Sequence, residues 1–172
     1  KGMGDALEIS TFVKNIVGNN ASASVILPAV LFVVAVFLSF STGTSWGTFA
    51  ILVPIAIAMF PGSENVQMMI IAVSAVLAGA VCGDHISPIS DTTVMSSAGA
   101  QSNHINHVTT QMQYAAVVAV VSFIGYIIAG FIHIWWVVLG ISLVLLLIIL
   151  NVLRRISNGK EQCADMQEKK HA

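Results

Sequence analysis

The chain has 172 residues, of which 56% are hydrophobic and 9% are charged, and its mean hydropathy is +0.88. This composition excludes a soluble globular domain and indicates an integral membrane protein that lies in a lipid bilayer. The formal net charge is −1, and no Lys or Arg occurs between Lys14 and Arg154. Nucleic-acid binding, which requires clustered basic side chains, therefore has no support.

Residues 1–23 mix apolar and charged side chains. Leu7, Phe12 and Ile16 recur at roughly helical spacing before the polar stretch GNNASAS. This weak stripe predicts a short interfacial or loop helix. Because the sequence opens on Lys1 and shows no signal-peptide pattern, we expect it to be the C-terminal part of a larger protein.

Residues 24–61 hold two apolar runs, 25–40 and 49–60, separated by the polar octapeptide STGTSWGT at 41–48. The second run has about 12 residues, which reach roughly 18 Å as a straight helix, whereas the hydrocarbon core is about 30 Å thick. Since this run cannot cross a bilayer alone, we predict a re-entrant helical hairpin with its polar tip at 41–48. Two full spans are the alternative.

Residues 66–100 begin as an apolar helix and then lose their regular pattern. Gly83, Pro88 and the hydroxyls of GDHISPISDTTVMSS remove backbone hydrogen bonds or compete for them. Irregular backbone at membrane depth persists only where it is buried in protein or lines a watery cavity. We therefore predict a discontinuous helix that becomes irregular at Gly83 and resumes at about residues 92–98.

Two further transmembrane helices are predicted within residues 114–153, so the expected fold is all-α and polytopic. The tail, residues 154–172, carries basic side chains next to the last span, and the positive-inside rule places it in the cytoplasm of a multi-pass protein of the cell (inner) membrane. Three crossings counted back from this tail put Glu64 outside and the loop around His104 and His107 inside.

Asp84 and Asp91 are two carboxylates in the predicted break, and the sequence offers neither a basic partner nearby. A charged side chain at mid-membrane costs at least about 2.5 kcal/mol, so an intramembrane carboxylate indicates a functional site. Two structural explanations stay open. A basic residue elsewhere in a longer protein pairs with one of the carboxylates, or the segment is an extramembrane loop.

Hydroxyl and carboxylate oxygens cluster at both polar breaks, and hard cations prefer oxygen ligands. Many secondary transporters build a midplane site from two broken elements. We expect Na⁺ as the only metal, and the candidate ligands for Na⁺ or H⁺ are Thr42, Thr44, Ser45, Asp84, Ser87, Ser90, Asp91 and Thr92. A single hydroxyl more often bonds back to its own helix, so the prediction depends on the clustering.

Three histidines accompany these oxygens. His85, beside Asp84, can relay protons or simply be held by a neighbouring oxygen. His104 and His107 are too few to complete a zinc site, so we expect them on a solvated loop or a pH-sensitive surface.

The segments FSTGTSWGTFAILVPIAIAM and CGDHISPISDTTVMSSAGAQSNHINHVTTQMQYA resemble the C-terminal half of the NhaC-type sodium/proton antiporter family, over roughly residues 24–115. The resemblance implies a secondary antiporter with paired hairpins and interrupted helices. Ile86 stands where the family often has Cys, and the 103–109 loop lacks charges that relatives often carry, which bears on loop-based regulation more than on transport. The resemblance places at the cation site the residues Asp84, Ser87, Asp91 and Thr92 and the tip TGTSWGT.

The predicted function is exchange of Na⁺ for H⁺, with Asp91, assisted by Asp84, binding either ion in turn. A Na⁺-coupled exchanger of organic acids and a passive, channel-like membrane subunit are the alternatives. The expected partners are the bilayer, the two ions and the missing N-terminal half of the same transporter, and a homo-oligomer stays open. We expect neither enzymatic activity nor a cofactor.

Overall fold

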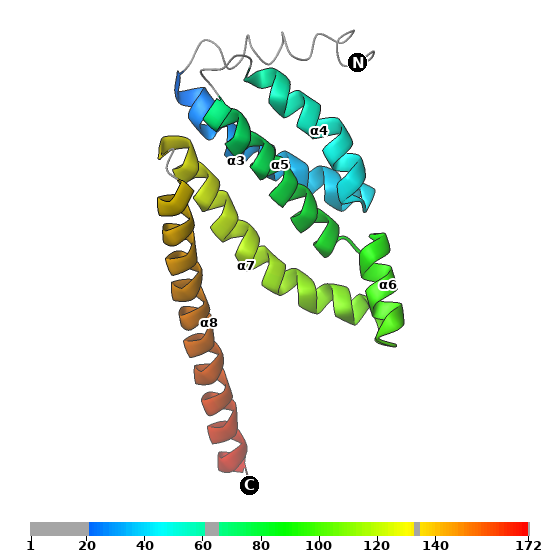
Figure 1. The fold of residues 1–172 in the computed structure, drawn as a ribbon. Coiled ribbons are helices and arrows are strands. Elements are labelled where there is room, and N and C mark those ends of the chain that lie inside the picture. Colours follow the sequence, from blue (N-terminus) through cyan, green and yellow to red (C-terminus); the bar gives the residue numbers. More distant parts are fainter. Residues whose placement is uncertain (1–20, 61–65, 133–134, 172) are drawn as a thin grey trace.

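The computed structural model describes residues 21–60, 66–132 and 135–171, and the side chains of 25–60, 66–132 and 136–155. Helices make up this part of the chain, and no strand occurs in it. The elements are α3 (Ala21–Thr42), α4 (Ser45–Met59), α5 (Val66–Ile86), α6 (Asp91–Gly99), α7 (His104–Phe131) and α8 (Trp135–His171), as Figure 1 shows. The predicted interfacial helix at 1–23 lies almost wholly outside the described residues.

Four of these helices are long and apolar enough to cross a membrane: α3, α5, α7 and α8. Helix α4 is different, because its 15 residues rise only about 22 Å, less than the hydrocarbon core. The predicted all-α, polytopic class is therefore confirmed, together with the helix interrupted between α5 and α6. The re-entrant course of the α3–α4 hairpin stays a prediction.

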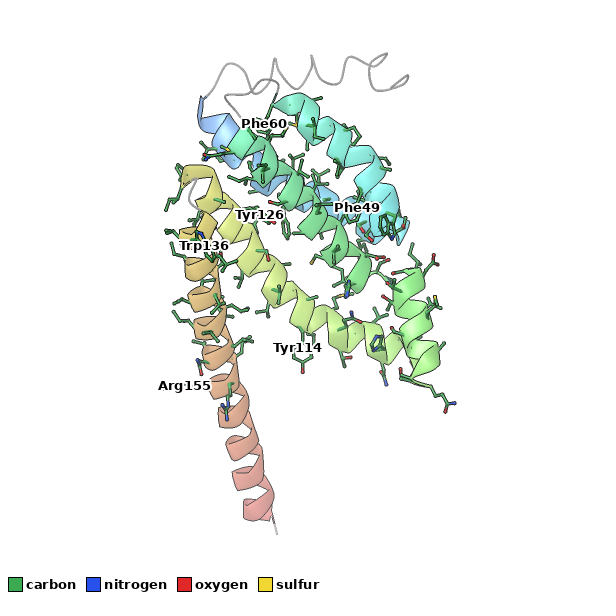
Figure 2. All side chains as sticks on the ribbon, viewed as in Figure 1. Phe49, Phe60, Tyr114, Tyr126, Trp136 and Arg155 are labelled. Carbon is green, nitrogen blue, oxygen red and sulfur yellow. The ribbon has the colours of Figure 1, made fainter. Side chains whose placement is uncertain are left out.

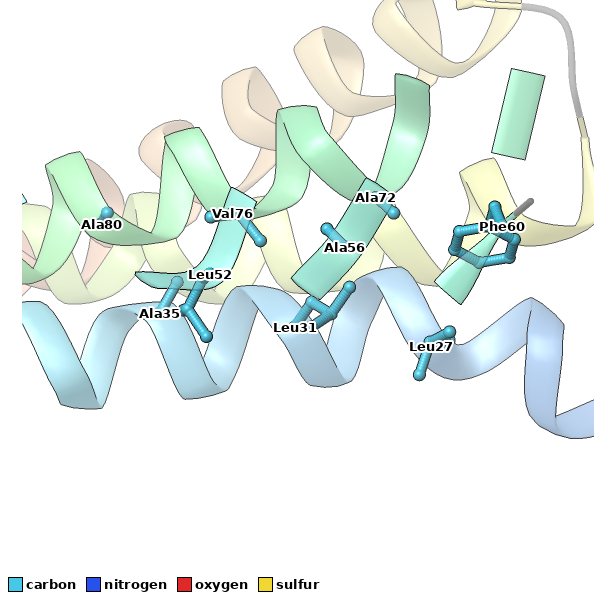
Figure 3. Packing of buried hydrophobic residues seen from close by; sticks show 9 residues of the cluster. All are labelled: Leu27, Leu31, Ala35, Leu52, Ala56, Phe60, Ala72, Val76 and Ala80. Atoms are coloured by element: carbon cyan, nitrogen blue, oxygen red, sulfur yellow. The ribbon is translucent and has the colours of Figure 1, made fainter. Parts of the chain in front are cut away.

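Helices α3, α4 and α5 share one apolar core (Figure 3). Buried alanines recur in this core, so the helix backbones can come close. The helices enclose a cluster of Leu27, Leu31, Ala35, Leu52, Ala56, Phe60, Ala72, Val76 and Ala80.

Helices α3 and α5 approach each other closely at Gly83. A Cβ at this position would collide with the Val36 carbonyl oxygen and lie 2.9 Å from the Phe40 nitrogen. One turn earlier on α5, the Ala80 carbonyl accepts a hydrogen bond of 2.6 Å from Ser39 Oγ. The expectation that α5 becomes irregular at Gly83 was wrong, since the helix continues to Ile86. The small-residue spacing of Ala75, Gly79 and Gly83 also predicts a close helix contact, and Gly83 makes one with α3.

Helix α7 lies across α3 and α5 (Figure 1). Tyr126 of α7, labelled in Figure 2, has its ring centroid 5.4 Å from that of Phe32 and donates a hydrogen bond of 3.0 Å to the Ser74 carbonyl. Helix α7 starts at His104, before the predicted span at 114–132, because Asn103 caps it by accepting a hydrogen bond from the Asn106 nitrogen. Residues 104–113 are therefore helical, and the expected loop around His104 and His107 was wrong.

Candidate cation site

The two polar breaks meet at one end of the α3–α4–α5 unit (Figure 1). Gly43 turns the chain between α3 and α4 with φ +66°, a left-handed conformation that glycine adopts without a steric cost. A Cβ there would lie 2.8 Å from the Ile89 carbonyl oxygen, inside the break between α5 and α6. The turn and the break are thus in direct backbone contact, as two cooperating oxygen clusters require.

Asp84 is the buried carboxylate of this junction, with 7% of its surface exposed. Ser90 Oγ donates to its Oδ1 at 2.6 Å, and Ser45 Oγ donates to its Oδ2 at 3.2 Å. The Ser90 hydroxyl also lies 2.8 Å from Thr92 Oγ1. Residues from α4, α5, the break and α6 therefore form one network of oxygens around a negative charge.

Ser87 joins the two breaks rather than completing this network. Its side chain is fully buried, and its Oγ donates to the Phe40 carbonyl at 2.8 Å. The same oxygen accepts from the Ile89 nitrogen at 3.4 Å. These bonds hold the break against the end of α3.

The threonines of the tip have ordinary local roles in this arrangement. Thr42 is exposed, and its Oγ1 donates to the Leu38 carbonyl of its own helix at 2.9 Å, as hydroxyls in helices commonly do. Thr44 precedes α4 in an extended conformation, and its carbonyl accepts from Thr48 Oγ1 at 3.1 Å. The structure brings neither hydroxyl into hydrogen-bond contact with Asp84.

Asp91 lies apart from the buried network. It is the first residue of α6 and is exposed, in a position where a negative charge complements the positive end of the helix dipole. His85 is also exposed, and its Nδ1 bonds to the Val81 carbonyl, 3.1 Å away, in its own helix. The sequence analysis predicts Asp91 as the main ion-binding residue, whereas the carboxylate that accepts the hydrogen bonds of the buried hydroxyl network is Asp84.

The histidines at the start of α7 contact serines of α6. His104 Nδ1 lies 3.0 Å from Ser97 Oγ, and His107 Nε2 lies 3.4 Å from Ser96 Oγ. No group of three or more His, Cys, Asp or Glu side chains that could hold a metal occurs in the described part of the chain. The contact of His104 with α6 could not be predicted from the sequence, because residues 100–103, which connect α6 to His104, show no helical or strand pattern.

Residues 43–47, Gly-Thr-Ser-Trp-Gly, have the Gly-x-Ser-x-Gly spacing of a hydrolase nucleophile elbow. That elbow needs a strand before the serine and a histidine within hydrogen-bond reach. Here a helix precedes the turn, and Ser45 Oγ donates directly to Asp84. The spacing alone therefore does not indicate hydrolase chemistry.

A buried carboxylate at paired helix breaks, within a polytopic helical chain, is a feature found in many secondary membrane transporters. The profile of the Na⁺/H⁺ antiporter family matches residues 2–131, and the chain belongs to this family. Membership indicates a membrane transporter rather than an enzyme.

Two curated relatives are similar to part of the chain. An uncharacterized protein of Haemophilus influenzae is 58% identical over 105 residues, which cover 61% of this chain and 20% of the relative. The malate-2H(+)/Na(+)-lactate antiporter of Bacillus subtilis is 32% identical over 111 residues, which cover 64% of this chain and 23% of the relative. The chain thus spans about a fifth of the length of these relatives. No solved structure matches.

Proposed function

We propose that this chain is part of an NhaC-type antiporter that exchanges Na⁺ for H⁺, and that Asp84 is the group for which the two ions compete. The observation that carries the proposal is the burial of this carboxylate among the hydroxyls of Ser45, Ser90 and Thr92. Hydroxyl and carboxylate oxygens suit Na⁺, and the same carboxylate can bind a proton in place of the cation.

Exchange then follows from exclusive occupancy. A site that holds either Na⁺ or H⁺, and that opens to one side of the membrane at a time, couples the two gradients without covalent chemistry. Movement of the tip at 42–48 against the break at 87–93, together with the rest of the transporter, would open the site to each side in turn. Asp91, exposed at the start of α6, would take part in ion entry.

An inner-membrane location with a cytoplasmic tail completes the proposal, and the basic residues Arg154 and Arg155 at the end of the last span support it. A homo-oligomer, a proton relay through His85 and cation ligation by Thr42 and Thr44 remain predictions of the sequence.

Exchange of organic acids is the second candidate, because the relative from Bacillus subtilis is named a malate-2H(+)/Na(+)-lactate antiporter. Such solutes carry carboxylates, which proteins commonly recognise with Arg or Lys. This chain has neither residue between Lys14 and Arg154. A basic group for an organic anion would therefore come from another part of the transporter, whereas the oxygen cluster at Asp84 suits the coupling cation. A passive subunit would need no buried carboxylate.

Transport by the full-length protein in proteoliposomes tests the proposal. An inward Na⁺ gradient should drive proton efflux, read by a pH-sensitive dye inside the vesicles. Asp84→Asn should abolish this exchange, and Asp91→Asn, the same change on an exposed carboxylate, should retain it with weaker apparent Na⁺ affinity. Normal exchange by Asp84→Asn and none by Asp91→Asn would return the principal role to Asp91. Exchange only in the presence of malate or lactate would favour the second candidate.

A further inference from the structure

We propose that His104 is a positioning residue that fixes the helix break carrying Ser90, a hydrogen-bond donor to the Asp84 carboxylate. His104 begins α7, and its Nε2 lies 2.8 Å from the Pro88 carbonyl oxygen in the middle of the break. Its Nδ1 lies 3.0 Å from Ser97 Oγ on α6. One imidazole ring thus connects the break, α6 and α7, which follow one another along the chain. The effect on transport rests on the proposed function, whereas the mechanical role does not.

The partners determine which ring nitrogen carries a hydrogen. A carbonyl oxygen can only accept, so Nε2 must donate to Pro88. Ser97 Oγ has a single hydrogen and lies within bonding distance of both His104 Nδ1 and the Val94 carbonyl, the latter at 2.9 Å. When the ring is neutral, Ser97 donates to Nδ1. When the ring is charged, Nδ1 donates to Ser97, which then donates to Val94.

Both charge states therefore keep the bond to Pro88. The role requires a donor at the position of Nε2 and does not require a charge or a titration. The need for a donor without a change of charge distinguishes positioning by His104 from a role as a proton carrier. It also predicts that a neutral side chain with a donor at the position of Nε2 can replace the histidine.

The break needs such a contact because its own backbone bonds are long. The Ser87 nitrogen donates to the Asp84 carbonyl at 3.2 Å, and the Ser90 nitrogen donates to the Ser87 carbonyl at 3.4 Å. Pro88 has no N–H and contributes no donor to this turn. Ser90, which donates to the Asp84 carboxylate, follows Pro88 by two positions, so the placement of the Pro88 carbonyl bears directly on that bond.

Burial on α6 and α7 agrees with this role. Ser97 is 3% exposed and Val108, one turn after His104, is 6% exposed, so the face of α7 that carries the imidazole packs against protein. His107 makes the weaker contact on a neighbouring face, 3.4 Å from the exposed Ser96 hydroxyl. It provides a matched control.

The test compares His104→Ala, His104→Gln and His104→Asn with His107→Ala in the full-length protein. The Gln amide nitrogen can reach the position of Nε2, whereas the Asn nitrogen reaches only that of Nδ1. Hydrogen–deuterium exchange of peptides covering residues 84–91 reports on the break, and Na⁺-driven proton efflux reports on the site.

We expect His104→Ala to speed exchange of the break amides by up to about tenfold, the change that loss of one partly buried hydrogen bond implies. It should also raise the half-saturating Na⁺ concentration several-fold, with a smaller change in maximal rate. Gln should restore both quantities to near the wild-type values, Asn should not, and His107→Ala should change neither. If His104→Ala does not accumulate as folded protein, the difference between Gln and Asn decides.

Two results would overturn the proposal. One is unchanged amide exchange in His104→Ala or in His104→Asn. The other is a Gln variant as impaired as the Asn variant, which would mean that a donor at the position of Nε2 does not suffice. If the wild-type protein shows no Na⁺-dependent transport while the amide exchange follows the expected order, the proposed function fails and the positioning role stands.

Discussion

Removal of the Ser90 hydroxyl tests the competition between Na⁺ and H⁺ most directly. Ser90 Oγ donates to Asp84 Oδ1 at 2.6 Å, a length typical of a bond to an ionised carboxylate. Such a bond contributes about 1.5–3 kcal/mol, whereas a bond to a neutral carboxyl group contributes about 1 kcal/mol. Ser90→Ala therefore penalises the ionised, Na⁺-binding form by the difference, about 1.3 kcal/mol in the middle of this range.

This difference corresponds to about a tenfold rise in the half-saturating Na⁺ concentration at a pH where the two ions compete. The sign follows because the variant weakens the ionised form relative to the protonated one. The rise should shrink as the pH increases and protons become scarce. Maximal rate should change less, since the charge on Asp84 is still present.

The assay measures Na⁺-driven proton efflux at two pH values, with Ser41→Ala as the matched control. Ser41 is exposed, lies in the same tip region and donates only to the Phe37 carbonyl of its own helix, at 2.8 Å. A Ser90→Ala variant whose Na⁺ dependence equals that of Ser41→Ala at both pH values would refute the reasoning, because the bond at 2.6 Å would then have no part in ion competition.

Gly83→Ala should lower the free energy of unfolding by about 1–3 kcal/mol, since the new Cβ meets backbone atoms of α3, while Gly140→Ala, with open space around it, should cause no loss. Thermal unfolding in detergent compares the two, and equal stability would contradict the close approach of α3 and α5. A cysteine introduced as Glu64→Cys, outside the described residues, and the native Cys163 should be labelled from opposite sides of the membrane. Labelling of both from the same side would contradict the three-crossing topology.

Sequence reasoning located the helix break and its polar partners because their causes are local. Pro88 removes a backbone donor, and Gly43 permits a turn that other residues resist, so both interruptions can be predicted without any tertiary contact. The abundance of side-chain oxygens around both interruptions can also be read directly from the sequence. The oxygens that Asp84 contacts come from separate segments, and the sequence does not determine which hydroxyls reach it and which, as at Thr42, bond back to their own helix.

The different burial of Asp84 and Asp91 could not be predicted from the local sequence. In a continuous helix, residues seven apart lie nearly on the same face, since about 3.6 residues make one turn. Asp84 and Asp91 would then point to the same side and have similar surroundings. The break at residues 87–90 uncouples their directions, so the carboxylate at the end of α5 is buried and the one at the start of α6 is exposed. Because the break itself sets this direction, and the bond from His104 to the Pro88 carbonyl holds the break, the environment of Asp84 depends on a contact made twenty residues further along the chain.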